Sequence, residues 1–202
     1  MGRGFESHGA YSFLKQSSSF CFEYTSFVIY PLLTERLSIE PLALSDLEPF
    51  VKYRQDPAIA RYQSWDESYS LDQGRELIQS QAGVLMPEMG EWLQLGLYDR
   101  NSGLLIGDVA IQALEDQKDC FELGFTLAKE FQGLGYANEA VSKVLEHLVA
   151  EEGARKFIAT PDSRNEASIR LLVSLGFEQN ASKTWNEEFK GETVTVYYFE
   201  KI

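Results

Sequence analysis

The sequence predicts an α/β (α+β) protein in which helices lie on the faces of a mixed sheet. Runs rich in β-branched and aromatic residues alternate along the chain with stretches in which apolar residues recur every three or four positions. The composition of the first kind of run is typical of strands, and the spacing in the second kind is the period of a helix. One expected strand is followed by a glycine-containing turn and then by the clearest helical stretch. With 202 residues, 44% of them hydrophobic, the chain is long enough to bury one substantial core.

Two pairs of residues in the first half of the chain have the spacing of a helix capping box. Ser45 precedes Glu48 by three positions, and Ser70 precedes Gln73 by the same interval. Each pair therefore predicts the start of a helix. The strands expected around them are Leu37–Leu42, Leu93–Tyr98 and Leu104–Ala113, and Asp99–Gly103 is the expected hairpin loop between the last two.

A strand with two different faces is expected just before the glycine-containing turn. Phe121 and the residues two, four and six positions after it are apolar, whereas the alternate positions carry Glu122 and smaller side chains. The helix after the turn has one apolar stripe, which predicts that a single face packs against the sheet. The stripe consists of Ala137, Ala140, Val141, Val144, Leu145 and Leu148.

The remaining elements follow the same logic. Lys156–Thr160 is the next expected strand, and Ser163 with Glu166 has capping-box spacing for the helix after it. Gly176 suits the left-handed position that ends such a helix. The chain is expected to finish in a hairpin, with Lys190–Gly191 at the turn and Thr193–Glu200 as the last strand.

The run Gln132–Ala137 has the features of a phosphate-binding turn. Its two glycines permit a tight turn, and the first N–H groups of the following helix have no partner inside the helix. Such an end binds phosphate oxygens without a lysine. A dinucleotide fingerprint is incomplete, because Asn138 stands at the third glycine position, and no Walker loop is present. A glycine-containing connection with no ligand remains the alternative.

The same run resembles the Q/R-x-x-G-x-G/A signature of the GNAT superfamily of acyl-CoA-dependent N-acetyltransferases, with Gln132, Gly135 and Ala137 in the signature positions. The later run Asn165–Phe177 resembles the N-x-x-[SA]-x-x-x-L-x-x-x-G-F helix of that superfamily, in the family's order. The resemblance extends over residues 33–202. It is nearest to the RimJ/RimL branch, the ribosomal-protein N-terminal acetyltransferases, of which the opening TERLSIEPL is typical.

The resemblance implies a GNAT fold, with a mixed, mostly antiparallel central sheet and helices on both faces. It also implies that acetyl-CoA is the co-substrate and that an amine attacks it directly in a ternary complex. For Asn165 an alternative stays open, because it could serve only as a helix cap. The cofactor-binding residues that the resemblance implies are Phe125, Thr126, Leu127, Gln132, Gly133, Leu134, Gly135, Tyr136, Ala137, Asn165 and Ser168.

Two residues are candidates for catalysis. Glu122 lies on the polar face of its strand, where enzymes of this branch often have a carboxylate, and partial burial would raise its pKa toward the range of a useful base. Its alternative is a solvated strand glutamate. Ser168 is a candidate hydrogen-bond donor to the thiolate, because Leu172 stands where many family members have tyrosine and cannot donate a proton.

The charge balance restricts the partners. With 18 basic and 31 acidic residues the net charge is −13, so nonspecific binding of nucleic acid is not expected, whereas a cationic acceptor is. The phosphates of CoA need local positive potential, from the helix start and from Lys129, Arg164 or Arg170, each of which could equally be only solvated. The few cysteines and histidines, Cys21, Cys120, His8 and His147, give no framework for a metal site, a disulfide or a covalent acyl-enzyme.

Residues 1–30 are expected to form an N-terminal extension, and residues 31–202 a single GNAT domain. The extension lacks a basic start followed by an apolar run of signal-peptide length, and no stretch approaches the roughly 20 apolar residues of a membrane helix. The expectation is a cytoplasmic enzyme, monomeric or homodimeric, that does not bind membranes.

Three functions remain open from the sequence. The first is acetylation of a protein N-terminal α-amine, and the second is acetylation of a small amine or antibiotic. The third comes from another class, a non-catalytic acyl-CoA-binding sensor or assembly subunit, for which Leu172 is the main support.

Overall fold

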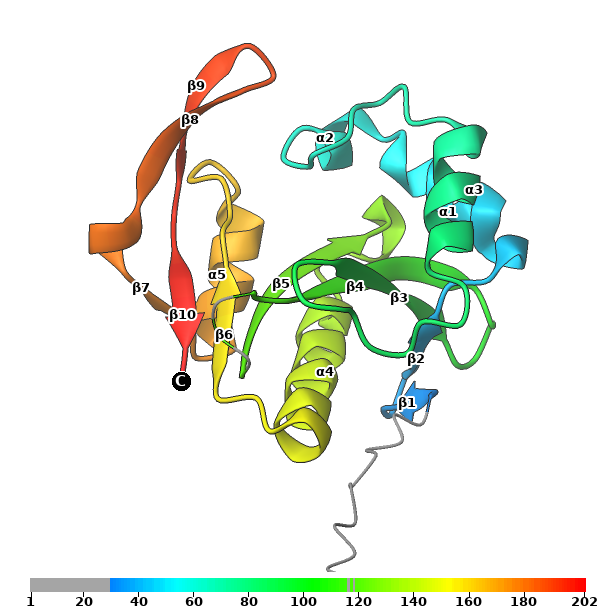
Figure 1. Cartoon of the computed structure of the whole chain (residues 1–202). Coiled ribbons are helices and arrows are strands. Elements are labelled where there is room, and N and C mark those ends of the chain that lie inside the picture. The colour runs from blue at the N-terminus through cyan, green and yellow to red at the C-terminus, as the bar shows by residue number, and fades with distance from the viewer. Residues whose placement is uncertain (1–29, 116, 118) are drawn as a thin grey trace, which may run out of the picture.

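The computed structural model describes residues 30–115, 117 and 119–202, which build one eight-stranded sheet and one two-stranded sheet (Figure 1). The expected extension, residues 1–30, therefore lies outside the described residues except for Tyr30. The large sheet has the order β1-β2-β3-β4-β5-β6-β10-β7. Its strands are β1 (Leu32–Leu33), β2 (Leu37–Pro41), β3 (Trp92–Asp99), β4 (Leu105–Ala113), β5 (Cys120–Leu127), β6 (Lys156–Ala159), β7 (Glu178–Gln179) and β10 (Phe199–Lys201).

The large sheet is mixed and mostly antiparallel, as expected. Its neighbouring strands run antiparallel except for β5 and β6, which are parallel. A parallel pair needs a long crossover, and α4 (Tyr136–Glu152) provides it. The register of this pair ends at Glu122 opposite Ile158, although β5 continues to Leu127. The two strands therefore part in the middle of the sheet.

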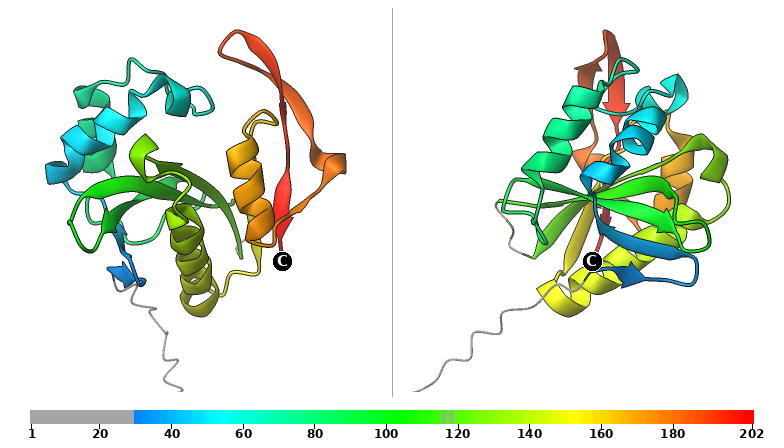
Figure 2. Two further views of the ribbon diagram at one scale, coloured as in Figure 1. Left: turned by 180° about the vertical axis from the view of Figure 1, so that it is seen from behind. Right: turned by 90° about the vertical axis from the view of Figure 1, so that its right-hand side faces the viewer.

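Helices cover both faces of the sheet. The α4 helix packs on one face, and its buried residues reproduce the apolar stripe expected from the sequence. On the opposite face lie α1 (Leu47–Arg54), α2 (Pro57–Ala60) and α3 (Leu71–Ser80) (Figure 2). The α5 helix (Glu166–Ser174) buries Leu172 in the same core cluster as α4. None of the helices in the described part of the chain is long and apolar enough to cross a membrane.

A buried polar cluster joins α1 to the sheet. The Tyr53 hydroxyl donates to Asp108 on β4 at 2.5 Å, and the Arg54 guanidinium lies 3.7 Å from the same carboxylate. Arg54 also lies over the rings of Phe50 and Trp65, at 4.1 and 3.8 Å from their centroids. Because these contacts reach from α1 to the segment after α2, they hold that segment over the sheet.

Most expected elements are present, but two helix starts differ from the capping-box prediction. The Ser70–Gln73 box forms as expected. The Ser45–Glu48 pair does not start a helix, because a 3₁₀ turn, η1 (Leu44–Asp46), comes first and α1 begins at Leu47. At α5 the cap is Asn165, whose side chain accepts from the Ser168 N–H, so Ser163 and Glu166 form no box.

The final hairpin also differs from the expectation. Lys190–Gly191 turns the chain as predicted, between β8 (Trp185–Phe189) and β9 (Glu192–Val196). The expected strand Thr193–Glu200 is broken in two, because β9 belongs to the hairpin, whereas β10 pairs with β6 and β7 in the large sheet. The chain changes sheets at Tyr197.

We expect that removing the Arg54 guanidinium destabilises the fold. Arg54→Met retains much of the volume but leaves Asp108 buried without its counter-ion, and breaking a buried ion pair from one side costs about 3–5 kcal/mol. Urea unfolding followed by circular dichroism measures the loss. The control is Arg75→Met, which breaks an exposed pair within α3 and should leave the unfolding free energy nearly unchanged. Equal stability of the two variants would contradict the structural role of Arg54.

Candidate active site

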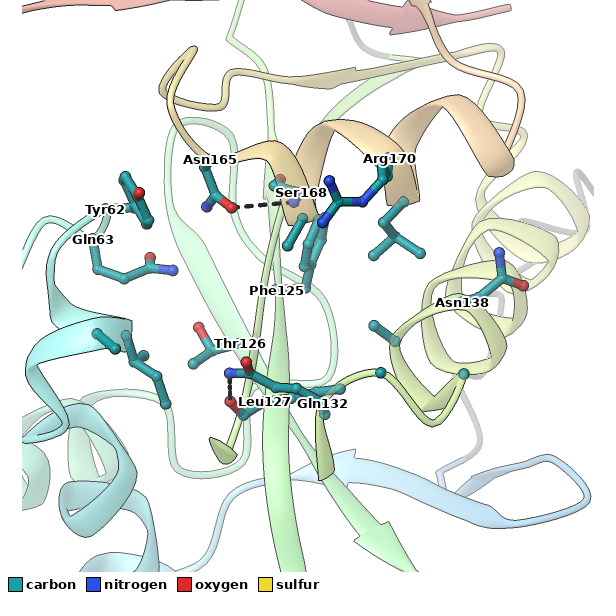
Figure 3. A pocket seen from close by; sticks show the side chains of 17 residues that line it. Tyr62, Gln63, Phe125, Thr126, Leu127, Gln132, Asn138, Asn165, Ser168 and Arg170 are labelled. Carbon is teal, nitrogen blue, oxygen red and sulfur yellow. Dashed lines mark hydrogen bonds between the residues drawn. The ribbon is translucent and has the colours of Figure 1, made fainter. Parts of the chain in front are cut away.

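The parting of β5 and β6 opens a cleft between β5 and α5. Beyond Glu122, β5 keeps β4 on one side and has no strand of the described chain on the other. Except for the Leu127 oxygen, which accepts from the Gln132 side chain, its outward N–H and C=O groups are therefore open to a ligand with amide groups. A cavity of about 450 Å³ fills this cleft (Figure 3). Its lining includes Tyr62, Phe125, Thr126, Leu127, Gln132, Gly133, Gly135, Ala137, Asn138, Asn165, Ser168, Arg170 and Leu171.

The glycine-containing turn forms one end of this cavity. Gly133 and Gly135 have φ angles of 73° and 83°, which glycine adopts without strain. The first intrahelical bond of α4 runs from the Glu139 N–H to the Gly135 oxygen at 3.1 Å. The N–H groups before Glu139 thus precede the helix ladder and carry the positive end of its dipole. The Gln132 side chain holds the turn to the end of β5 by donating to the Leu127 oxygen at 2.9 Å.

Arg36, at the start of β2, braces the turn from behind. Its guanidinium donates to the Leu134 oxygen at 2.9 Å and to the Glu139 carboxylate at 2.6 Å. It also lies 4.3 Å from the centroid of the Tyr136 ring. Because the Leu134 carbonyl is held toward Arg36, the peptide dipoles of the turn have one fixed orientation. The sequence analysis did not identify Arg36, because its partners lie about a hundred positions along the chain.

The start of α5 forms the wall opposite β5. The Asn165 side-chain oxygen accepts from the Ser168 N–H at 3.1 Å, so Asn165 caps the helix. Asn165, Ser168 and Arg170 also line the cavity, and the Arg170 guanidinium is paired at 3.0 Å with Glu166, one turn earlier on the same helix. Leu172, on the same helix, is completely buried and does not reach the cleft. Of the other expected cations, Arg164 is paired with Asp162 and Glu192, and Lys129 does not line the cavity.

Glu122 lies in a second cavity of about 380 Å³, adjoining the first. Its carboxylate accepts from the Thr160 hydroxyl at 2.7 Å. Burial raises the pKa of Glu122, and the hydrogen bond from Thr160 opposes that shift. The two cavities have five lining residues in common, namely Tyr62, Gln63, Phe125, Asn165 and Ser168.

Three hydrogen bonds from two side chains span the outer side of the cleft. The Lys190 ammonium, at the hairpin turn, donates to the Ala60 oxygen at 2.7 Å and also to the Trp65 oxygen. The Tyr62 hydroxyl donates to the Arg164 oxygen at 3.4 Å. These contacts join the segment after α2 to the hairpin and to the loop before α5, so the second cavity has walls on both sides.

The structure brings the expected site residues together with two exceptions. Leu134 and Tyr136 do not line either cavity, because the Leu134 side chain is exposed and the Tyr136 ring lies against Arg36. The other expected cofactor residues line the first cavity. Among the described residues, no group of three or more His, Cys, Asp and Glu side chains is placed to hold a metal ion.

Relatives are similar to this chain in sequence, and solved structures are similar to it in fold. The uncharacterized N-acetyltransferase p20 of Bacillus licheniformis is 26% identical over 85% of this chain and 95% of its own length. The spermidine N-acetyltransferase of Vibrio cholerae, solved with CoA and spermine, superposes with a TM-score of 0.71 at 19% identity over 83% of this chain and 96% of that one. The ribosomal-protein-S5-alanine acetyltransferase of Vibrio fischeri gives a TM-score of 0.71 at 18% identity, over 84% of this chain and 94% of that one. At these identities the structures show the fold alone.

The sequence itself matches a family. Residues 36–178 match the model of the acetyltransferase (GNAT) domain, which is more than half of the chain and includes both the glycine-containing turn and the α5 wall. The mixed sheet, the parted strands and the open helix start thus occur in a chain that belongs to the GNAT family of acetyltransferases.

Proposed function

We propose that this protein transfers an acetyl group from acetyl-CoA to a primary amine, by direct attack of the amine in a ternary complex. The main support for this proposal is that the two cavities have a common wall. An acyl donor in the first cavity can therefore meet an amine acceptor in the second cavity, beside Glu122. Residues 31–202 act as one acetyltransferase domain in this proposal, since both core clusters pack on one sheet.

The first cavity suits CoA. Its diphosphate binds the N–H groups of the turn from Gln132 to Ala137, with the α4 dipole and Arg170 as positive potential. The amides of the pantetheine arm pair with the open edge of β5 along Phe125, Thr126 and Leu127. The Asn165 side-chain nitrogen is then free to donate to the same arm, while its oxygen remains the cap of α5.

Glu122 is the proposed general base. The amine nitrogen attacks the thioester carbonyl, the C–S bond breaks, and the proton released from nitrogen passes to Glu122 directly or through water. The raised pKa of Glu122 makes it a stronger base than an exposed glutamate. The Ser168 hydroxyl donates a hydrogen bond to the departing thiolate, since Leu172 is apolar and buried.

The acceptor is a protein N-terminal α-amine or a small amine. An α-amine has a pKa of about 7.8 against about 10.4 for lysine, so deprotonating it at neutral pH costs about 3.5 kcal/mol less. A single carboxylate can therefore deprotonate an α-amine more easily than a lysine side chain. The opening TERLSIEPL supports the RimJ/RimL branch, whereas the fold does not separate the two acceptors, because a spermidine and a ribosomal-protein acetyltransferase share it equally. Incubation with acetyl-CoA and a mixed library of peptides and amines, followed by mass spectrometry, identifies the acceptor.

A non-catalytic acyl-CoA sensor is the second candidate, and the buried Leu172 favours it because the position at which many family members have tyrosine carries no proton donor. The same library separates the two functions. A sensor would bind acetyl-CoA but consume it no faster with any amine than without one.

Glu122→Gln is expected to lower kcat by roughly 10²–10⁴-fold while leaving the affinity for acetyl-CoA unchanged, because only the base is removed. Thr160→Val removes the hydrogen bond that favours the ionised carboxylate. The pKa of Glu122 then rises further, so the acid limb of the kcat profile moves to higher pH with the same acceptor. Stopped-time assays across pH measure both effects. An unchanged acid limb in Glu122→Gln would remove Glu122 as the base.

Gly135→Val is expected to abolish acetyl-CoA binding in a folded protein. The φ of 83° strains any branched residue, and the turn would rearrange so that its N–H groups no longer converge. Gly153→Val is the matched control, because Gly153 has a φ of 66° at the other end of α4, away from both cavities. Calorimetric titration with acetyl-CoA compares the two variants. Retained affinity in Gly135→Val would contradict the proposed diphosphate site.

Arg36→Met is expected to raise the KM for acetyl-CoA by roughly tenfold, since the turn loses a charge-assisted contact that fixes its amides. The KM for acetyl-pantetheine, which lacks the diphosphate, should stay unchanged. Arg100→Met is the control, because Arg100 donates to the Thr34 oxygen beside Arg36 without touching the turn. An equal rise with both acyl donors would mean that Arg36 acts on the whole fold and does not position the turn.

A further inference from the structure

The hairpin of β8 and β9 has one face inside the second cavity. Trp185, Glu187 and Phe189 line the cavity, and the alternate residues Asn186 and Glu188 do not. This is the two-residue period of a strand. On β9 the partners of Trp185 and Glu187 are Val196 and Val194, which line the cavity as well. Glu187 is therefore a single carboxylate on an otherwise apolar inner face.

Aromatic side chains line the same cavity as this carboxylate. The Trp185 indole N–H donates to the Glu187 carboxylate at 2.9 Å, which fixes the orientation of the indole and the acid. Trp92, from β3, lines the same cavity. The two tryptophans remain 39% and 37% exposed, which is unusual for such large apolar side chains. Aromatic faces beside a carboxylate are the groups that attract an organic cation.

The charged residues that line the second cavity are all acidic, namely Glu122, Asp162 and Glu187. None of the described residues that line it is Lys, Arg or His, and the same holds for the adjoining third cavity, of about 1040 Å³, which brings Glu76, Glu88 and Glu91. The cations beside the cavity do not line it. Arg61 lies over the Tyr62 ring, Lys190 donates to two main-chain oxygens, and Arg164 is paired with Glu192 and with Asp162, which itself lines the cavity. A second positive charge on an acceptor would thus find no competing cation among the described lining residues.

We propose that Glu187 and Trp185 form a subsite for a second cationic group, so that the preferred acceptors carry a positive charge a few bonds from the reacting amine. The inference rests on the proposed function, because it places the reacting amine beside Glu122 in the same cavity. A diamine and a peptide with a basic second residue both have this chemistry. The subsite selects between acceptors that Glu122 alone does not distinguish.

The test compares acceptors that differ only in the second charge. The wild-type protein is expected to have a kcat/KM at least tenfold higher for 1,4-diaminobutane than for 1-aminobutane, after correction for the two equivalent amines, because a charge-assisted contact is gained. An Ala-Lys amide against an Ala-Leu amide gives the same comparison for peptides. The pair with the larger ratio of kcat/KM values shows whether the preferred acceptor is a diamine or a peptide with a basic second residue. Equal values within both pairs would overturn the proposal.

Two variants test whether Glu187 causes the preference for acceptors with a second positive charge. Glu187→Gln should reduce the preference to about twofold or less. Glu188→Gln, one residue along on the outer face of β8, makes the same charge change and should retain it. A preference that survives in Glu187→Gln would also overturn the subsite. If no amine is turned over, the proposed function fails. Calorimetric titration with 1,4-diaminobutane then decides the subsite, which requires binding that Glu187→Gln abolishes and Glu188→Gln keeps.

Discussion

The parting of β5 and β6 after Glu122 is the constraint on which the rest of the site depends. Strands that stayed paired would satisfy the outer edge of β5 and leave no room between it and α5. Because the pairing stops, the open edge, the start of α5 and the first N–H groups of α4 face one cavity, and Glu122 lies at the point where the strands separate. A backbone feature thus places the cavity proposed for the donor beside the cavity proposed for the acceptor.

The electrostatics of the cleft follow from the same geometry. The chain carries a net charge of −13, yet the first cavity has a helix start and Arg170, whereas the second contains only carboxylates among the charged groups of its described lining. The proposed anionic donor and the proposed cationic acceptor would therefore be drawn to different ends of one cleft. The acidic composition and the binding of an anionic cofactor are compatible because oriented N–H groups supply local positive potential without net charge.

Local patterns predicted the fold well where the local chain decides the structure. The α4 stripe, the β3–β4 hairpin, the Ser70–Gln73 box and the Lys190–Gly191 turn all form. The errors have a common cause. Capping-box spacing also occurs at Ser45 and Ser163, but the path by which the chain enters each helix makes it start elsewhere. The last expected strand is divided because its two halves pair with different strands.

The sequence by itself determined the family, the glycine-containing turn and the strand that carries Glu122, because glycine positions and strand periodicity are local properties that residue types encode directly. Only the tertiary structure decided which residues support that turn and which face the second cavity. Arg36 meets Glu139 across 103 positions, and Glu187 enters the cavity of Glu122 from a hairpin near the end of the chain. Contacts between distant segments depend on the path of the whole backbone, and no local pattern in one sequence records that path.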